Sequence, residues 1–268
     1  MRLIAGIVVM ALALGGAGCS GQDVGAPCPA EGCGLQEMRT LPYTSPASVL
    51  RMMEVVTPDQ DGSWPVVIVA HGFGQKRRYV RDWATGIAAR GAVTYNVDWP
   101  TGSEELAERL ACAVRVALDD AANHGADTSR FVFVGHSLGA SVGAAVSLGG
   151  STASADCAVA DGDALPDAFV GYEGGYDLTE VAPEGVPVGA DPYAQIGGNP
   201  DLVLRLLHGD AGVTVPMSAS EDFAQALGDA GYDAELVVVK GGDHGSLSEG
   251  SPAQQAVVDQ VTDLLNSL

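Results

Sequence analysis

A serine between two glycines is the residue of this chain best suited to nucleophilic chemistry. Ser137 is the middle residue of Gly-His-Ser-Leu-Gly, residues 135–139, after an aromatic and β-branched run at 131–134 and before small residues at 140–148. This order predicts a buried strand, a turn too tight for side chains at its two glycines, and a closely packed helix. A serine at such a turn has an exposed hydroxyl beside a helix N-terminus. The segment therefore predicts a nucleophile that attacks an acyl carbon.

A serine hydroxyl is a weak nucleophile and needs an adjacent base. Among the five histidines, His244 alone follows the last predicted strand, in the glycine-rich loop 241–245. With a pKa of about 6.5, a histidine can take the proton of the serine and return it to the leaving group. We therefore expect His244 to be the general base for Ser137. His136 and His208 are expected to orient turns instead of reacting.

Strands and helices alternate along most of the chain. Strands are predicted at 49–56, 65–70, 92–97, 131–134, 167–172, 201–207 and 234–240, and helices at 76–90, 103–123, 140–148, 218–230 and 252–265. Unbroken apolar strands separated by helices predict an α/β fold with a mostly parallel sheet covered on both faces. Sites in such sheets lie at the carboxyl ends of the strands. The polar or glycine-rich loops that follow these strands are therefore expected to form the site.

Four segments occur in the order that α/β-hydrolases show. They are His-Gly-Phe-Gly at 71–74, Gly-His-Ser-Leu-Gly at 135–139, His-Gly-Asp at 208–210 and Asp-His-Gly at 243–245. Over residues 49–268 the chain resembles an α/β-hydrolase, near the secreted esterase and dienelactone-hydrolase-like branches. The resemblance implies a nucleophile, an acid and a histidine in that order, with no metal and no cofactor. It also implies an oxyanion hole formed by the N–H groups of Phe73 and Leu138.

The acid is the position at which the chain departs from this family. Relatives carry an aspartate where this chain has Gly212, in the segment 208–216. Asp210, two residues earlier on the same loop, is the first candidate for the acid. Glu173, at the end of the preceding strand, is the second, because some lipases place their acid there. Asp177 is a third candidate, although an aspartate in this setting more often has a structural role in esterases.

The first residues are typical of an export signal. Residues 1–18 combine Arg2, an apolar run at 3–14 and a small-residue end. The segment that ends in Cys19 resembles a bacterial lipoprotein signal, in which this cysteine carries a lipid. We expect an exported protein, either secreted or held at the cell envelope by a lipid on Cys19. Residues 19–46, rich in glycine and proline, are expected to be a flexible tether to a hydrolase domain at 47–268.

Four cysteines remain after Cys19. An even number in an exported protein indicates disulfides. The short loop between Cys28 and Cys33 favours a local bridge, which leaves Cys112 to pair with Cys157. A zinc site is the alternative, but no histidine lies near Cys28 or Cys33 at the spacing of a zinc site.

Charge and composition restrict the partners. The net charge of −21, with 34 acidic against 13 basic residues, argues against binding to nucleic acid or to anionic lipid.

The segment 178–200 contains four prolines and no helical period, which predicts an irregular loop in place of a helical cap. An open site favours esters of modest size, or the end of a polymer, as substrates. We expect the protein to be a monomer. Tyr172, Trp99 and Tyr193 are candidates for the cleft wall, although packing is the commoner role of such side chains.

These observations favour a serine esterase that forms an acyl-enzyme on Ser137. The alternative from another class is a non-catalytic surface lipoprotein on a hydrolase scaffold, which Gly212 suggests. A peptidase of the prolyl-oligopeptidase type is chemically close, but the chain shows no segment typical of the propeller domain of those enzymes. Hydrolysis of short p-nitrophenyl esters distinguishes the esterase from the lipoprotein.

Overall fold

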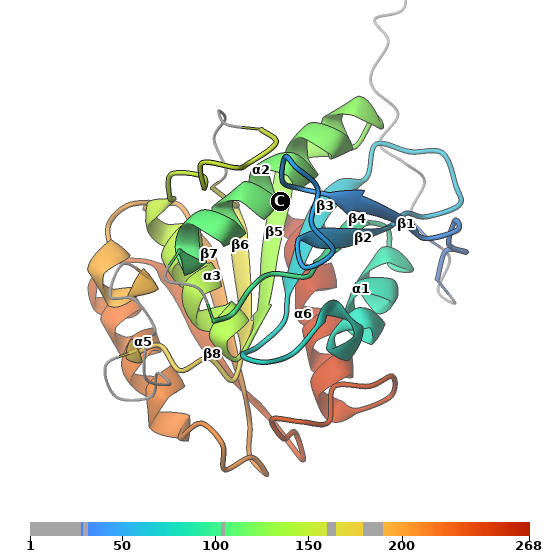
Figure 1. Ribbon diagram of the computed structural model, residues 1–268. Helices are drawn as coiled ribbons and strands as arrows, with labels where there is room; N and C mark the ends of the chain where they lie inside the picture. The colour runs from blue at the N-terminus through green and yellow to red at the C-terminus, as the bar shows by residue number, and fades with distance from the viewer. Residues whose placement is uncertain (1–27, 29–31, 103–104, 160–164, 179–189) are drawn as a thin grey trace, which may run out of the picture.

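The computed structural model describes residues 28, 32–102, 105–159, 165–178 and 190–268. In this part of the chain, eight strands form one sheet in the order β1-β2-β4-β3-β5-β6-β7-β8 (Figure 1). The strands are β1 Arg39–Pro42, β2 Met52–Val56, β3 Pro65–Ala70, β4 Val93–Val97, β5 Asp127–His136, β6 Ala168–Tyr172, β7 Val203–Gly209 and β8 Asp233–Val239. All neighbours from β4 to β8 are parallel, and β1 and β2 add two antiparallel pairings at one edge.

Helices cover both faces of the sheet. The described helices are α1 Arg81–Ala88, α2 Leu106–Asn123, α3 Leu138–Gly149, α5 Met217–Asp229 and α6 Pro252–Ser267, with short 3-10 turns at Arg77–Tyr79 and Tyr193–Gln195. Because side chains alternate along a strand, Val67 and Val69 of β3 pack with α1 and α6, whereas Val66 and Ile68 pack with α2 and α3. The expected α/β architecture is therefore present. None of the described helices is long and apolar enough to cross a membrane.

The predicted elements agree with the observed ones to within a few residues at most boundaries. The predicted helix at 76–90 is shorter in the structure, because 77–79 form a 3-10 turn before α1 begins at Arg81. The signal peptide and residues 19–27 and 29–31 of the predicted tether, Cys19 among them, lie outside the described residues. Residues 179–189 of the predicted irregular loop lie outside them as well.

The prediction of a flexible tether is wrong for residues 39–46. These residues contain strand β1, which pairs antiparallel with β2. Tyr43, directly after β1, is fully buried and donates its hydroxyl proton to the carbonyl of Asp98 at 2.9 Å. Arg39 forms an ion pair with Asp120 of α2. Strand pairing and one buried aromatic ring hold this segment although its sequence has no apolar period.

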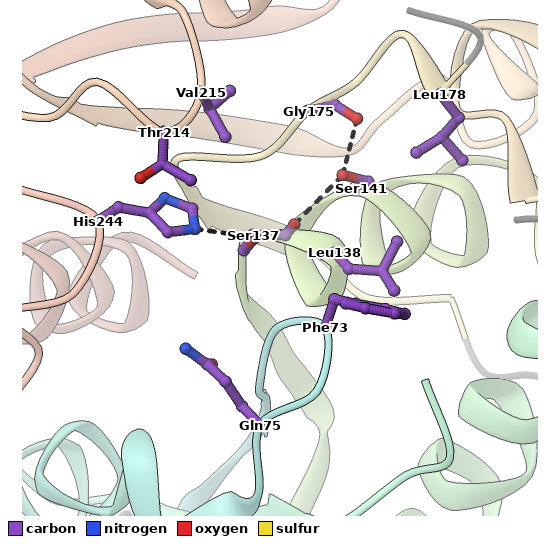
Figure 2. Close-up of a pocket in the computed structure, with 10 residues that line it drawn as sticks. All are labelled: Phe73, Gln75, Ser137, Leu138, Ser141, Gly175, Leu178, Thr214, Val215 and His244. Carbon is purple, nitrogen blue, oxygen red and sulfur yellow. Dashed lines mark hydrogen bonds between the residues drawn. The ribbon is translucent and has the colours of Figure 1, made fainter. Parts of the chain in front are cut away.

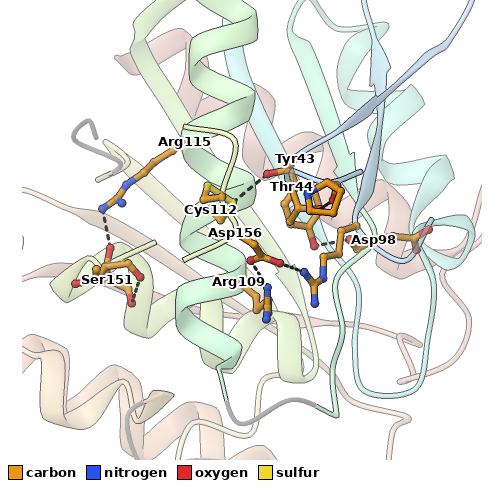
Figure 3. The surroundings of a disulfide bond; sticks show 12 residues. Tyr43, Thr44, Asp98, Arg109, Cys112, Arg115, Ser151 and Asp156 are labelled. Carbon is orange, nitrogen blue, oxygen red and sulfur yellow. Dashed lines mark hydrogen bonds and ion pairs between the residues drawn. A yellow bond between two sulfur atoms is a disulfide. The ribbon is translucent and has the colours of Figure 1, made fainter. Parts of the chain in front are cut away.

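The structure contains the two disulfides Cys28–Cys33 and Cys112–Cys157, and these pairs leave no thiolate for the zinc alternative. The second bridge joins α2 to the segment after α3 (Figure 3). Next to it, Asp156 forms ion pairs with Arg51 and with Arg109, the latter at 2.5 Å. The bridge and the ion pair of Arg109 therefore both tie α2 to the same short segment.

Candidate active site

Ser137 occupies the sharp corner between β5 and α3. Its φ of +53° lies in the left-handed region, which a residue other than glycine rarely adopts and which is typical of strained functional turns. A Cβ on Gly139 would lie 2.5 Å from the carbonyl oxygens of Ala70 and His71. The turn therefore passes so close to β3 that only glycine fits there. This packing holds the serine hydroxyl at the carboxyl edge of the sheet.

His244 lies against this serine. Its Nε2 is 3.1 Å from Ser137 Oγ, in the loop that follows β8 (Figure 2). The loop is fixed by Asp243, whose carboxylate accepts hydrogen bonds from the N–H groups of Gly245 and Ser246 at 2.8 and 2.9 Å. A hydrogen bond from the Ser246 side chain, together with these two backbone bonds, lowers the pKa of Asp243. The histidine predicted from its position in the sequence is thus in contact with the predicted serine.

Glu173 contacts the other side of the His244 ring. Its Oε2 lies 2.7 Å from His244 Nδ1, and its Oε1 accepts a hydrogen bond from the N–H of Gly209 at 3.2 Å. Glu173 is fully buried directly after β6, with a φ of +47°. A strained backbone at a buried carboxylate is typical of a functional position. Ser137, His244 and Glu173 therefore form one hydrogen-bonded chain.

Asp210, our first candidate for the acid, does not contact His244. It follows β7 directly, where its exposed carboxylate accepts a hydrogen bond from the N–H of Gly241 at 2.6 Å. It therefore closes the turn after β8 instead of reaching the histidine. A Cβ on Gly212, the position of the acid in the family pattern, would lie only 2.8 Å from Glu173 Oε1. Glu173 thus occupies the space that a carboxylate from the loop after β7 would need.

The two residues expected to form the oxyanion hole, Phe73 and Leu138, have backbone N–H groups with no acceptor in the described part of the chain. Leu138 is the first residue of α3, and N–H groups in the first turn of a helix have no acceptor within that helix. Phe73 follows β3, and in the described part of the chain its N–H has no hydrogen-bond partner. Both residues line the cavity with Ser137 (Figure 2). The arrangement offers two donors to a negative oxygen beside the serine.

Hydrogen bonds fix the loop on both sides of Phe73. The Gln75 side-chain oxygen accepts the N–H of Gly72 at 2.9 Å, and Thr101 Oγ1 accepts the N–H of Gly74 at 3.0 Å. The loop is therefore set before any substrate arrives. Gln75 was not predicted from the sequence, because a glutamine five residues beyond a strand has no distinctive pattern.

The cavity beside Ser137 has a volume of about 370 Å³. Its wall is formed by Phe73, Gln75, Ser137, Leu138, Ser141, Gly175, Leu178, Thr214, Val215 and His244 (Figure 2). This volume is at the lower end of the range for small-molecule sites. Tyr172 and Trp99 are buried in the protein interior, and Tyr193 packs on Phe223 with ring centroids 5.0 Å apart. These three aromatic residues pack against the protein and do not line the cavity.

His136 links the loop of Phe73 to the loop of His244. Its Nδ1 lies 3.0 Å from the Gln75 side-chain oxygen, and its Nε2 lies 3.0 Å from the carbonyl oxygen of His244. Burial, with a smaller contribution from the nearby His244 ring, lowers the pKa of His136 to about 3. The ring is therefore neutral at neutral pH. This agrees with the expectation that His136 orients turns.

The lowered pKa of His136 predicts a loss of stability in mild acid. An unfolded histidine takes up a proton as the pH falls below about 6.5, whereas the folded His136 stays neutral until about pH 3. The free energy of unfolding should then fall by roughly 1.4 kcal/mol per pH unit for this one residue. In urea unfolding between pH 6.5 and 4.5, the His136→Gln variant should show a shallower slope than the wild type. His124→Gln, at an exposed residue after α2, is the control, and equal slopes for all three proteins would refute the assignment.

Comparison with known proteins supports the fold. No protein-family model and no curated protein matches the chain. A truncated carbohydrate esterase from gut microbiota superposes with a TM-score of 0.66 at 17% identity, over 90% of this chain and all of that one. Esterase 2 of the planctomycete Thermogutta terrifontis superposes with TM-scores of 0.66 when bound to butyrate and 0.68 when phosphonylated by cyclosarin, at 21% identity over 81% of this chain and 88% of that one. The chain thus has the α/β-hydrolase fold.

Proposed function

We propose that this protein is a serine hydrolase that cleaves carboxylic esters of modest size. The observation that carries the proposal is the hydrogen-bonded chain from Ser137 Oγ through His244 to Glu173, at 3.1 and 2.7 Å. A nucleophile, a base and a group that orients the base are the parts that acyl transfer through a serine requires. The alternative of a non-catalytic lipoprotein rests on Gly212, and the contact between Glu173 and His244 argues against it.

In the proposed reaction, Ser137 Oγ attacks the acyl carbon while His244 Nε2 takes the hydroxyl proton. The carbonyl oxygen becomes an oxyanion that accepts hydrogen bonds from the N–H groups of Phe73 and Leu138. The C–O bond to the alcohol then breaks, and His244 gives its proton to the leaving oxygen. Glu173 keeps the Nδ1 proton in place and stabilises the imidazolium. Water, activated by the same histidine, attacks the acyl-enzyme and releases the acid and the free serine.

The volume of the cavity supports a substrate of modest size. A volume of about 370 Å³ accommodates a short acyl or alcohol group and not a long lipid chain. Phe73 and Leu178 give its wall an apolar part, while Ser141 and Thr214 add hydroxyls. The butyrate bound in Thermogutta esterase 2 is a short acyl group of this kind. We therefore propose p-nitrophenyl acetate and butyrate as first test substrates.

Covalent labelling tests the nucleophile. An organophosphate such as paraoxon should phosphorylate the wild-type protein once, with the added mass on the peptide that contains Ser137, because the oxyanion donors and His244 activate that hydroxyl. Hydrolysis of p-nitrophenyl butyrate should be lost in parallel with labelling. Ser137→Ala should show neither reaction, whereas Ser141→Ala, which removes a neighbouring hydroxyl of the same cavity, should still be labelled. Labelling of another residue, or none together with no hydrolysis above the Ser137→Ala background, would refute the proposed function.

The setting of the enzyme is also a proposal. Two disulfides are compatible with folding in an oxidising compartment outside the cytoplasm. We propose that the protein is exported and acts as a monomer on small esters or on the ester end of a polymer. Contact with a membrane would then be limited to a lipid on Cys19.

A further inference from the structure

A second hollow with a basic wall lies next to the catalytic cavity. It has a volume of about 290 Å³ and is lined by Lys76, Arg77, Arg78, Arg81 and Asp98. We call it the basic hollow. Four of the 13 lysines and arginines of a chain with net charge −21 thus gather within six residues. Such a cluster of positive side chains in an acidic protein is suited to bind a negatively charged ligand.

The charges of the basic hollow are not neutralised by the protein. Arg77 forms ion pairs with Asp98 and Glu54, and Arg81 forms one with Glu54. Lys76 and Arg78 form no ion pair within the described residues, and Arg78 lies over the Tyr79 ring at 5.0 Å. The four cations of the basic hollow are thus paired with only two carboxylates, which leaves a net charge of two positive units there.

The floor of the basic hollow is built before a ligand binds. Burial disfavours the charge of Glu54, yet hydrogen bonds from Arg81 and Arg77 hold the pKa of this carboxyl below its ordinary value. The backbone N–H of Arg77 donates to Asp98 Oδ1 at 2.7 Å, and Asn96 donates to the carbonyl of Arg77 at 3.0 Å. The two guanidinium groups remain partly exposed. Fixed guanidinium groups at a hollow are suited to bind carboxylate or sulfate oxygens.

The loop after β3 connects the basic hollow to the catalytic cavity. Phe73 and Gln75 line the catalytic cavity, and Lys76, the next residue, lines the basic hollow. Asp98 directly follows β4, the parallel neighbour of β3, so both hollows open at the carboxyl edge of the sheet. Consecutive residues of one loop thus line the catalytic cavity and the basic hollow.

We propose that the basic hollow binds an anionic group, a carboxylate or a sulfate, carried by the ester that Ser137 cleaves. The inference rests on the proposed function and adds a substrate class to it, namely esters with a negative charge on the acyl or the alcohol part. The strong negative charge of the rest of the chain disfavours polyanions. A single small anion fits both the volume and the local charge.

Two matched pairs of esters test the proposal. On the acyl side, mono-p-nitrophenyl glutarate is compared with p-nitrophenyl valerate; on the alcohol side, 4-acetoxybenzoate is compared with its methyl ester. In the Lys76→Met/Arg78→Met variant, kcat/KM for the anionic member of at least one pair should fall about tenfold, whereas the neutral members should change less than about twofold. The loss should diminish at high salt, since salt screens exposed charges.

The control variant changes the net charge by the same amount, but at positions far from the basic hollow. Arg90→Met/Arg130→Met removes two cations, of which Arg90 is exposed after α1 and Arg130 lies near the start of β5, at the opposite end from Ser137. It should leave the ratio of anionic to neutral kcat/KM unchanged. An equal loss of kcat/KM for both members of each pair, or no loss for any ester, would refute anion binding at the basic hollow. The proposed esterase activity would not be affected by that result. Wild-type protein that cleaves none of the four esters and is not labelled at Ser137 would overturn the proposed function itself.

Discussion

Glu173→Gln is expected to lower kcat for p-nitrophenyl butyrate by about 10³- to 10⁴-fold, with little change in KM. The carboxylate contacts His244 Nδ1 at 2.7 Å and not the cavity, so its loss should spare substrate binding. The amide can present its NH₂ group to Nδ1 and favour the tautomer that cannot take the proton of Ser137. The remaining activity should come from the oxyanion donors and from binding. Steady-state kinetics over a range of substrate concentrations separates kcat from KM.

Asp210→Asn is the matched control, because it makes the same chemical change in the neighbouring loop. Asp210 contacts the N–H of Gly241, and an asparagine oxygen can accept that bond. Its kcat should stay within about twofold of the wild type. Far-UV circular dichroism and the midpoint of thermal unfolding should be similar for both variants. A large loss of kcat with Asp210→Asn and none with Glu173→Gln would identify Asp210, the first candidate from the sequence, as the acid.

The sequence pattern predicted the serine and the histidine that lie in contact, but it favoured Asp210 over Glu173, which is the carboxylate that contacts His244. The reason is geometric. β6 and β7 are adjacent and parallel, with Tyr172 opposite Leu207. A carboxylate that follows either strand is therefore near a histidine that follows β8. Linear spacing cannot separate these two positions, because it contains no information on which side chain turns inward.

Gly212 was the signal that could have decided between them. From the sequence alone, its missing side chain suggests the loss of an acid and a replacement on the same loop. In the structure, a side chain at this position would collide with Glu173. In this chain, Gly212 therefore leaves room for the carboxylate of Glu173, which comes from the neighbouring strand.

The extent of the fold was predictable where local patterns were strong. Buried runs such as Pro65–Ala70 matched their strands residue for residue, since every side chain of β3 is buried. Strand β1 was missed because its four residues are half polar and it lies at the sheet edge. Its order comes from pairing with β2 and from the buried ring of Tyr43, which are contacts distant in the sequence. No local pattern can reveal such contacts.

Gly135→Ala is expected to lower the free energy of unfolding by about 3 kcal/mol or more, or to prevent folding. A Cβ at this position would lie 2.5 Å from the backbone N and Cα of Ala140, in the first turn of α3. Backbone atoms cannot move aside as a flexible side chain can, so α3 would have to shift as a whole. It packs against β5 and β3 and is buried along nearly its entire length. Urea unfolding followed by fluorescence measures the loss.

Gly228→Ala is the control for the chemical change itself. Gly228 is exposed in α5, and nothing lies within 4 Å of its added Cβ outside the helix backbone. Alanine should stabilise this helix by about 0.5 to 1 kcal/mol, because glycine loses more backbone entropy on folding. The two substitutions should thus have opposite signs. A Gly135→Ala protein with wild-type stability and esterase activity would mean that α3 can retreat from β5, and the strained corner would then not be what holds Ser137 in place.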